Sequence, residues 1–143
     1  PLLTAELRRV HQFVTFSVST PTQHALADVL PDAALYASLP GFYQQKRDLF
    51  RELLAGTGFE LLPVPGGYFQ VASYQALAPD EDDVTFARRL TQQAGVAVVP
   101  LSAFYHDGHD QGLVRFCFAK QEATLRAAAE RLRRLQATGR GEE

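Results

Sequence analysis

The hydrophobic period of the chain changes near Gly56 and Gly58, and this change most constrains the possible folds. Before it, apolar residues recur at the helical spacing of three and four, from Leu3 to Phe13, after Pro21, and from Phe42 to Leu54. After it come two short apolar runs, Phe59 to Leu62 and Gly67 to Ala72, joined by a Pro- and Gly-rich link. This pattern predicts an antiparallel β-hairpin behind a set of helices.

Residues that favour the ends of helices predict where the first helices begin and end. Thr4 is available to cap the first helix, and Thr20 followed by Pro21 is a typical start for the second. A further helical segment runs from Asp32 to Leu39, and Pro40-Gly41 is expected to interrupt or kink it. Because no hydrophobic pattern repeats at a fixed interval, the chain is not a repeat protein.

The remaining elements complete an α+β fold. A helix from Val84 to Ala94 ends at Gly95, and a buried strand is expected from Val96 to Val99. A second strand from Leu113 to Phe118 precedes a last helix, whose apolar face comprises Leu125, Ala128, Ala129, Leu132 and Leu135. We therefore expect a small, mostly antiparallel sheet with helices packed on one face. The tail from Thr138 to Glu143 is expected to fray.

Charge and cysteine content exclude several classes of protein. The chain of 143 residues carries 14 basic and 16 acidic side chains, which gives nucleic acid no basic surface to bind. It contains no apolar stretch near the ~18 residues that a membrane span needs. A single cysteine, Cys117, cannot form an internal disulfide and favours a reducing compartment. The absence of methionine and the Pro-Leu-Leu start suggest a piece of a longer protein.

Two polar clusters resemble metal sites but are better explained otherwise. The run Asp80 to Asp83 lacks the alternating spacing of a calcium loop, and acidic residues at a helix start cap it and complement its dipole. His106 and His109 lie three residues apart, but His11 and His24 belong to other helices, so a solvated loop is favoured. We expect no metal site.

Two further candidates are explained as structure. Cys117 lies between Phe116 and Phe118 in a strand, where a cysteine usually behaves as a small hydrophobic residue. The Pro65-Gly66-Gly67 link is turn chemistry, because no helix follows it to bind a phosphate.

Arg115 is the residue that the fold alone does not explain. Side chains alternate along a strand, so Val114, Phe116 and Phe118 are expected under the helices. Arg115 then lies on the other face, beside small neighbours that leave room around it. An arginine in so apolar a strand either forms a salt bridge across a domain junction or binds an anion, and the pattern does not decide between the two.

Around this strand the chain closely resembles a known family. The segment VRFCFAK from Val114 to Lys120, with Glu122 to Leu125 after it, is similar to the C-terminal end of pyridoxal-phosphate aminotransferases of fold type I. The resemblance is to the group of methionine and kynurenine aminotransferases. It extends upstream through VAVVPLSAFY, PGGYF and LPGFYQQKRD, and back to Val10-His11-Gln12 and the segment from Thr15 to Pro21.

The resemblance implies an enzyme, a cofactor and a set of site residues. The full-length enzyme is implied to use pyridoxal 5′-phosphate and to exchange an amino group between a methionine-like or aromatic amino acid and a 2-oxo acid. Arg115 matches the arginine that binds the substrate carboxylate, and Phe69 an aromatic residue near the substrate. Phe16 resembles an aromatic residue that reaches the neighbouring subunit's active site. Thr20 lies where the family places residues near the neighbour's cofactor phosphate.

The resemblance also implies what this chain lacks. The lysine that forms the Schiff base is implied to lie before Pro1, and Lys46 and Lys120 lie in the wrong motifs, so no catalytic residue is expected in the chain. Residues 1–20 would connect to the large domain, residues 21–137 would form the small C-terminal domain, and the enzyme would be a cytoplasmic homodimer. The 143 residues alone are expected to be inactive.

Two alternative functions remain open from the sequence. Related enzymes of the same fold are pyridoxal-phosphate-dependent C–S lyases, which eliminate instead of transaminating. The α+β layout by itself would also permit a non-catalytic ligand-binding domain.

Overall fold

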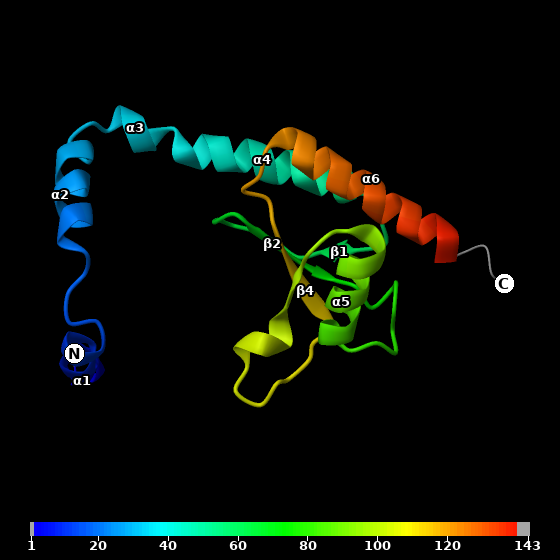
Figure 1. Cartoon of the computed structure of the whole chain (residues 1–143), viewed down its shortest axis with the longest axis horizontal. Helices are drawn as coiled ribbons and strands as arrows, with labels where there is room; N and C mark the ends of the chain where they lie inside the picture. Colours follow the sequence, from blue (N-terminus) through cyan, green and yellow to red (C-terminus); the bar gives the residue numbers. More distant parts are fainter. Residues whose placement is uncertain (1, 140–143) are drawn as a thin grey trace. The chain divides into compact units, whose positions relative to one another are not determined.

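The computed structural model describes the backbone of residues 2–139 and the side chains of residues 2–134, in two compact units that divide between Leu39 and Pro40. Figure 1 traces both units along the chain. Within residues 2–139, no helix is long and apolar enough to cross a membrane.

The first unit consists of three helices, α1 (Leu2–Val14), α2 (Thr20–Val29) and α3 (Ala34–Ala37). None of them contains a buried residue, and the apolar stripe Leu3, Leu7 and Val10 of α1 is exposed. The predicted caps are wrong. Thr4 lies inside α1, and Ser19 rather than Thr20 occupies the N-cap position of α2, without a side-chain hydrogen bond to the helix.

The second unit begins with α4 (Leu39–Leu54), in which Pro40 and Gly41 lie in the first turn. The predicted interruption at this Pro-Gly pair is therefore wrong. The first four N–H groups of a helix have no acceptor within it, so a proline there removes no hydrogen bond. At its other end, α4 buries Phe50 and Leu54 against the core.

Four strands form one antiparallel sheet in the order β1-β2-β4-β3. They are β1 (Glu60–Leu61), β2 (Phe69–Ser73), β3 (Val99–Pro100) and β4 (Leu113–Cys117). The predicted hairpin is confirmed by the β1–β2 pairing, in which Glu60 lies opposite Ser73. The strand predicted at Val96–Val99 is wrong in its bounds, since pairing begins only at Val99. Val96 is buried without sheet pairing. An apolar run in a sequence indicates burial and does not show whether the backbone is paired with another strand.

Three helices of this unit cover one face of the sheet. The core joins Phe50 of α4, Phe86 and Leu90 of α5 (Asp83–Ala94), and Leu125 of α6 (Glu122–Gly139) to Val114, Phe116 and Phe118. Helices α4 and α6 run side by side, and Arg133 Nη2 donates to the Leu53 carbonyl at 2.7 Å (Figure 1). The α+β class, with its antiparallel sheet and helices on one face, is confirmed.

The C-terminal predictions are partly outside the described residues. Leu125, Ala129 and Leu132 of α6 are buried as the helical stripe predicts. The side chain of Leu135 lies outside the described residues. Helix α6 extends to Gly139, and residues 140–143 of the tail lie outside the described residues, so the expected fraying stays a prediction.

Candidate functional site

Arg115 occupies the middle of β4, between two neighbouring strands. It lies opposite Val71 of β2 and Val99 of β3. The predicted alternation is confirmed, because Val114 and Phe116 are buried under the helices while Arg115 and Cys117 are half-buried on the opposite face. The sheet therefore presents Arg115 on the face that the helices leave uncovered.

Two aromatic rings hold the Arg115 guanidinium. Its carbon Cζ lies 4.0 Å from the centre of the Phe69 ring and 4.9 Å from the centre of the Phe104 ring. Contacts of this kind stabilise a guanidinium by roughly 0.5–2 kcal/mol, depending on how much water is excluded. A guanidinium in contact with an aromatic ring can still donate hydrogen bonds from the N–H groups at the edge of its plane.

The N–H groups of Arg115 find no acceptor in the described part of the chain. Nε is buried and has no hydrogen-bond partner, and no carboxylate of residues 2–134 lies within 4.0 Å of the guanidinium. A buried donor without an acceptor costs free energy, about 1–3 kcal/mol. An anion with two oxygens would satisfy such a fork, and so would a carboxylate from another part of the protein.

Phe69 is fixed by the strand and by the residues around it. Phe69 pairs with Cys117 on β4, its ring centre lies 4.4 Å from that of Tyr68, and Phe118 N donates to the Tyr68 carbonyl at 3.0 Å. The next residue, Gln70, points to the helix side, where it is fully buried and bonded. Phe69 is therefore held in place beside Arg115, and its predicted role near a substrate stays a prediction.

Sequence reasoning missed Phe104 as a partner of Arg115. Phe104 ends the short 3₁₀ helix η1 (Leu101–Phe104), and it is 61% exposed although its ring contacts the guanidinium. No local pattern points to it, because the contact joins residues that are eleven positions apart in sequence and lie on different elements. The available signal was its place in the VAVVPLSAFY segment that carries the family resemblance.

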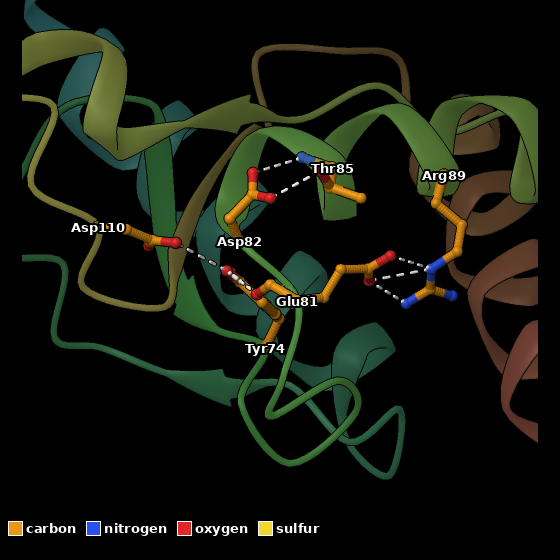
Figure 2. Close-up of polar contacts among 6 residues, drawn as sticks. All are labelled: Tyr74, Glu81, Asp82, Thr85, Arg89 and Asp110. Atoms are coloured by element: carbon orange, nitrogen blue, oxygen red, sulfur yellow. Dashed lines mark hydrogen bonds and ion pairs between the residues drawn. The ribbon is translucent and has the colours of Figure 1, made fainter.

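Within the acidic run from Asp80 to Asp83, Asp82 caps helix α5 and Asp83 lies in its first turn, as predicted, whereas Asp80 is exposed outside the cap. Asp82 caps the helix, with Oδ1 accepting from Thr85 N at 2.9 Å and Oδ2 from Thr85 Oγ1 at 2.7 Å (Figure 2). These hydrogen bonds lower the pKa of the Asp82 carboxyl. Glu81 forms an ion pair with Arg89 at 2.7 Å, and its hydrogen bonds to Arg89 raise the pKa of the guanidinium.

In the loop from His106 to Gly112 both histidines and Asp110 are exposed, and the Asp110 carboxylate accepts hydrogen bonds from backbone N–H groups. Oδ1 of Asp110 accepts from Gly112 N at 2.7 Å, and Oδ2 accepts from Asp83 N at 2.8 Å. Tyr74 donates its hydroxyl proton to the Glu81 carbonyl at 2.9 Å and also approaches Asp110 (Figure 2). Burial, and the negative charges of Asp110 and Asp83, raise the pKa of the Tyr74 phenol.

The other predicted site residues, Phe16 and Thr20, belong to the first unit. Phe16 follows the end of α1 with φ at 55°, in the left-handed region that a bulky residue rarely adopts, and its side chain is 87% exposed. Thr20 is the first residue of α2 and is exposed. Their roles toward a second subunit stay predictions.

Lys46, one of the two lysines in the chain, contacts the backbone of the other, Lys120. Lys46 Nζ donates to the Lys120 carbonyl at 2.5 Å and lies 4.8 Å from the centre of the Phe42 ring. Lys120 is exposed just before α6. The Gly66-Gly67 turn leads into β2 rather than into a helix, so it does not form a phosphate-binding helix start.

Comparisons with known proteins decide the family. The family model described as aminotransferase class I and II matches residues 3–132. The chain belongs to this family. It is 51% identical to the methionine aminotransferase of Escherichia coli over 134 residues, which cover 93% of this chain and 34% of the relative. It is 32% identical to the kynurenine–oxoglutarate transaminase of Dictyostelium discoideum, over 91% of this chain and 35% of that protein.

Solved aminotransferase structures have the same fold. YbdL from Escherichia coli, whose structure and reactivity identified a methionine aminotransferase function, superposes on 91% of this aminotransferase chain with a TM-score of 0.77 and 51% identity. N-succinyldiaminopimelate aminotransferase from Mycobacterium tuberculosis gives a TM-score of 0.76 at 32% identity over 93% of this chain. The chain covers 34% and 35% of these two proteins, so it spans about a third of the length of the relatives it matches.

Proposed function

We propose that the full-length protein containing this chain is a pyridoxal-phosphate-dependent aminotransferase. It would exchange an amino group between an amino acid and a 2-oxo acid. A methionine-like or aromatic amino acid is the proposed donor, because relatives of this chain include a methionine aminotransferase and kynurenine–oxoglutarate transaminases.

The proposal rests on one observation above all, the Arg115 guanidinium that contacts two aromatic rings and has no acceptor at its buried Nε. We infer that this side chain binds the α-carboxylate of the substrate. Two parallel N–H···O bonds from a guanidinium fix both oxygens at once, so the amino acid cannot rotate about its carboxylate. Arg115 thus orients the substrate, and the bond that must break at Cα is held in one direction relative to the cofactor.

The cofactor supplies the electron sink for the reaction, and this chain supplies orientation. Lys46 and Lys120 do not fit its covalent attachment, since one donates to a backbone carbonyl and the other lies exposed at a helix start. We propose that the attachment lysine belongs to another part of the full-length protein.

We further propose that Phe69 borders the substrate. Its ring already contacts Arg115, so it would lie beside a bound amino acid. Phe16, exposed and with left-handed backbone, would reach the site of a partner subunit in a homodimer, and Thr20 would lie near that subunit's cofactor phosphate. Residues 1–20 would then connect to the large domain and residues 21–137 would belong to the small domain. The single cysteine supports a cytoplasmic location.

The experiment uses the purified full-length holoenzyme with methionine as donor and a 2-oxo acid as acceptor. An aminotransferase forms the amino acid of the acceptor and the 2-oxo acid of the donor in equal amounts, and without an acceptor it releases no more than one 2-oxo acid per active site. A C–S lyase instead releases ammonia and a thiol without any acceptor. Release of ammonia and thiol, with no new amino acid, would overturn the proposed reaction.

A further inference from the structure

Asp83 is a buried carboxylate whose hydrogen bonds leave the helix that carries it. It is the first residue of α5 and is 1% exposed. Its Oδ2 accepts from Ser102 N and its Oδ1 from Ser102 Oγ, both at 2.7 Å. A buried carboxylate persists only where hydrogen bonds satisfy its oxygens. Here both oxygens are satisfied by a single residue of η1.

The same turn of α5 also holds the far end of the segment that follows Ser102. The backbone N–H of Asp83 donates to Asp110 Oδ2 at 2.8 Å, and Asp110 Oδ1 accepts from Gly112 N at 2.7 Å. Residues 102–112 are therefore fastened at both ends, one end by the side chain of Asp83 and the other by its backbone. The Tyr74 hydroxyl also contacts Asp110 at this end of the segment (Figure 2).

Between these two attachments lies Phe104. It follows Ser102 by two residues within η1, and Tyr105 N donates to the Ser102 carbonyl at 3.0 Å. Phe104 is 61% exposed, so burial does little to hold its ring in place. Its position over Arg115 depends on the backbone of η1, and the position of that backbone depends on the hydrogen bonds from Ser102 to Asp83.

We propose that Asp83 is a positioning residue for the carboxylate-binding arginine. By fixing Ser102 it holds Phe104 against the Arg115 guanidinium, so that the N–H edge of Arg115 stays directed at the substrate carboxylate. The inference rests on the proposed function, in which Arg115 binds that carboxylate. It adds that a residue of α5, acting through η1, sets the geometry in which the carboxylate is bound.

The test uses the full-length holoenzyme and measures competitive inhibition by two compounds. One is the substrate with its amino group replaced by hydrogen, which keeps the carboxylate, and the other is the amine that remains when the carboxylate is removed. The variants are Asp83→Ala, Asp83→Asn, Phe104→Ala and the double variant Asp83→Ala/Phe104→Ala. Asp82→Ala is the matched control, because Asp82 caps the same helix but does not bond to Ser102.

We expect Asp83→Ala to weaken inhibition by the carboxylic acid about fivefold or more, and to leave inhibition by the amine within about twofold. Asn at position 83 can accept from Ser102 N and donate to Ser102 Oγ, so Asp83→Asn should restore most of the affinity. Phe104→Ala should match Asp83→Ala, and the double variant should be no weaker than either, because both changes remove the same contact.

Several results would overturn the inference. Additive losses in the double variant, equal losses for both inhibitors, or the same loss in Asp82→Ala would make Asp83 a purely structural residue. If Asp83→Ala does not fold, Ser102→Ala replaces it in the same cycle with Phe104→Ala. If Arg115→Lys weakens inhibition by the carboxylic acid and Asp83→Ala does not, only this inference fails. If Arg115→Lys leaves both inhibitors unchanged, the proposed function fails with it.

Discussion

Arg51 of α4 donates from Nη1 to the buried Gln70 Oε1 at 2.8 Å, across the boundary between the helical layer and the sheet. The same Nη1 donates to the Leu62 carbonyl at 2.9 Å, and Gln70 Nε2 donates to that carbonyl at 2.8 Å. Three groups thus share one closed network. It fixes the base of the β1–β2 loop and the strand residue that follows Phe69.

Replacing Gln70 by leucine should destabilise the protein. The change keeps the side-chain volume but leaves Arg51 and the Leu62 carbonyl short of a partner, and we expect the free energy of unfolding to fall by about 1–3 kcal/mol. Chemical denaturation of wild type and variant measures this difference. Gln92→Leu, at an exposed position of α5, is the matched control and should change stability little. Equal stability of Gln70→Leu and wild type would show that the network is energetically neutral.

Arg115→Lys should impair the reaction of amino acids in the full-length enzyme. Lysine keeps the charge but loses the fork of donors, and hydrogen bonds to charged groups contribute on the order of 1.5–3 kcal/mol each. With the loss of orientation, kcat/KM for an amino acid should fall roughly a hundredfold or more. The measurement compares an amino acid with its decarboxylated amine in both proteins.

The amine is the control for Arg115→Lys, because it offers no carboxylate to bind. Its kcat/KM should change much less, and the cofactor should still bind. A salt bridge across a domain junction, the other explanation for Arg115, predicts lower thermal stability and equal losses for both substrates.

Asp82→Ala should lower the thermal midpoint in a way that depends on pH. Hydrogen bonds from Thr85 lower the pKa of the Asp82 carboxyl in the folded state, so the unfolded state takes up a proton first as the pH falls. The stabilisation is therefore present above about pH 4, the ordinary range of an aspartate, and is lost as the pH falls through the folded-state value. Thermal melts at neutral pH and near pH 2.5 test this.

Asp80→Ala is the control for that series, since Asp80 is exposed and outside the cap. Its midpoint should track wild type across the pH range. A gap between Asp82→Ala and wild type that persists undiminished at the lowest pH would contradict the assignment of this stability to the ionised carboxylate.

The isolated 143-residue chain should not bind pyridoxal phosphate covalently at a defined lysine. Lys46 is engaged with the Lys120 carbonyl, and Lys120 lies exposed before α6. Incubation with the cofactor, reduction with borohydride and peptide mass mapping should find only partial labelling at both sites. Stoichiometric labelling of either lysine would contradict the proposal that the attachment lysine lies elsewhere in the protein.

Local patterns predicted the parts of this structure that local physics decides. Alternation along residues 113–118 placed Arg115 on the uncovered face, and the change of period at Gly56 to Gly58 placed the hairpin after the helices. The cap at Asp82 followed from an acidic residue in front of an apolar helical stripe. The alternation and the cap involve residues that are close together in the chain, and the hairpin joins two strands that follow each other directly.

The features that the sequence did not predict depend on contacts between residues that are distant in the chain. No sequence pattern near Phe104 predicts its contact with Arg115. None near Asp83 predicts its hydrogen bond to Ser102, nineteen positions away. The third strand was misplaced because Val96 is buried without joining the sheet. Thr20 and Ser19 are equally good caps by residue type, so the choice between them depended on where the backbone turns helical.

The position of Arg115 in β4 has a consequence for folding itself. Arg115 lies between Val114 and Phe116, which face the core, and a shift of β4 by one residue against β2 would exchange the two faces. The guanidinium would then enter the apolar layer among Phe50, Phe86 and Leu125, while Phe116 would meet water. Burying an unpaired charge in that way costs several kcal/mol, so the misaligned sheet is disfavoured. The side chain proposed to select the substrate thereby also selects the alignment of the strand that carries it.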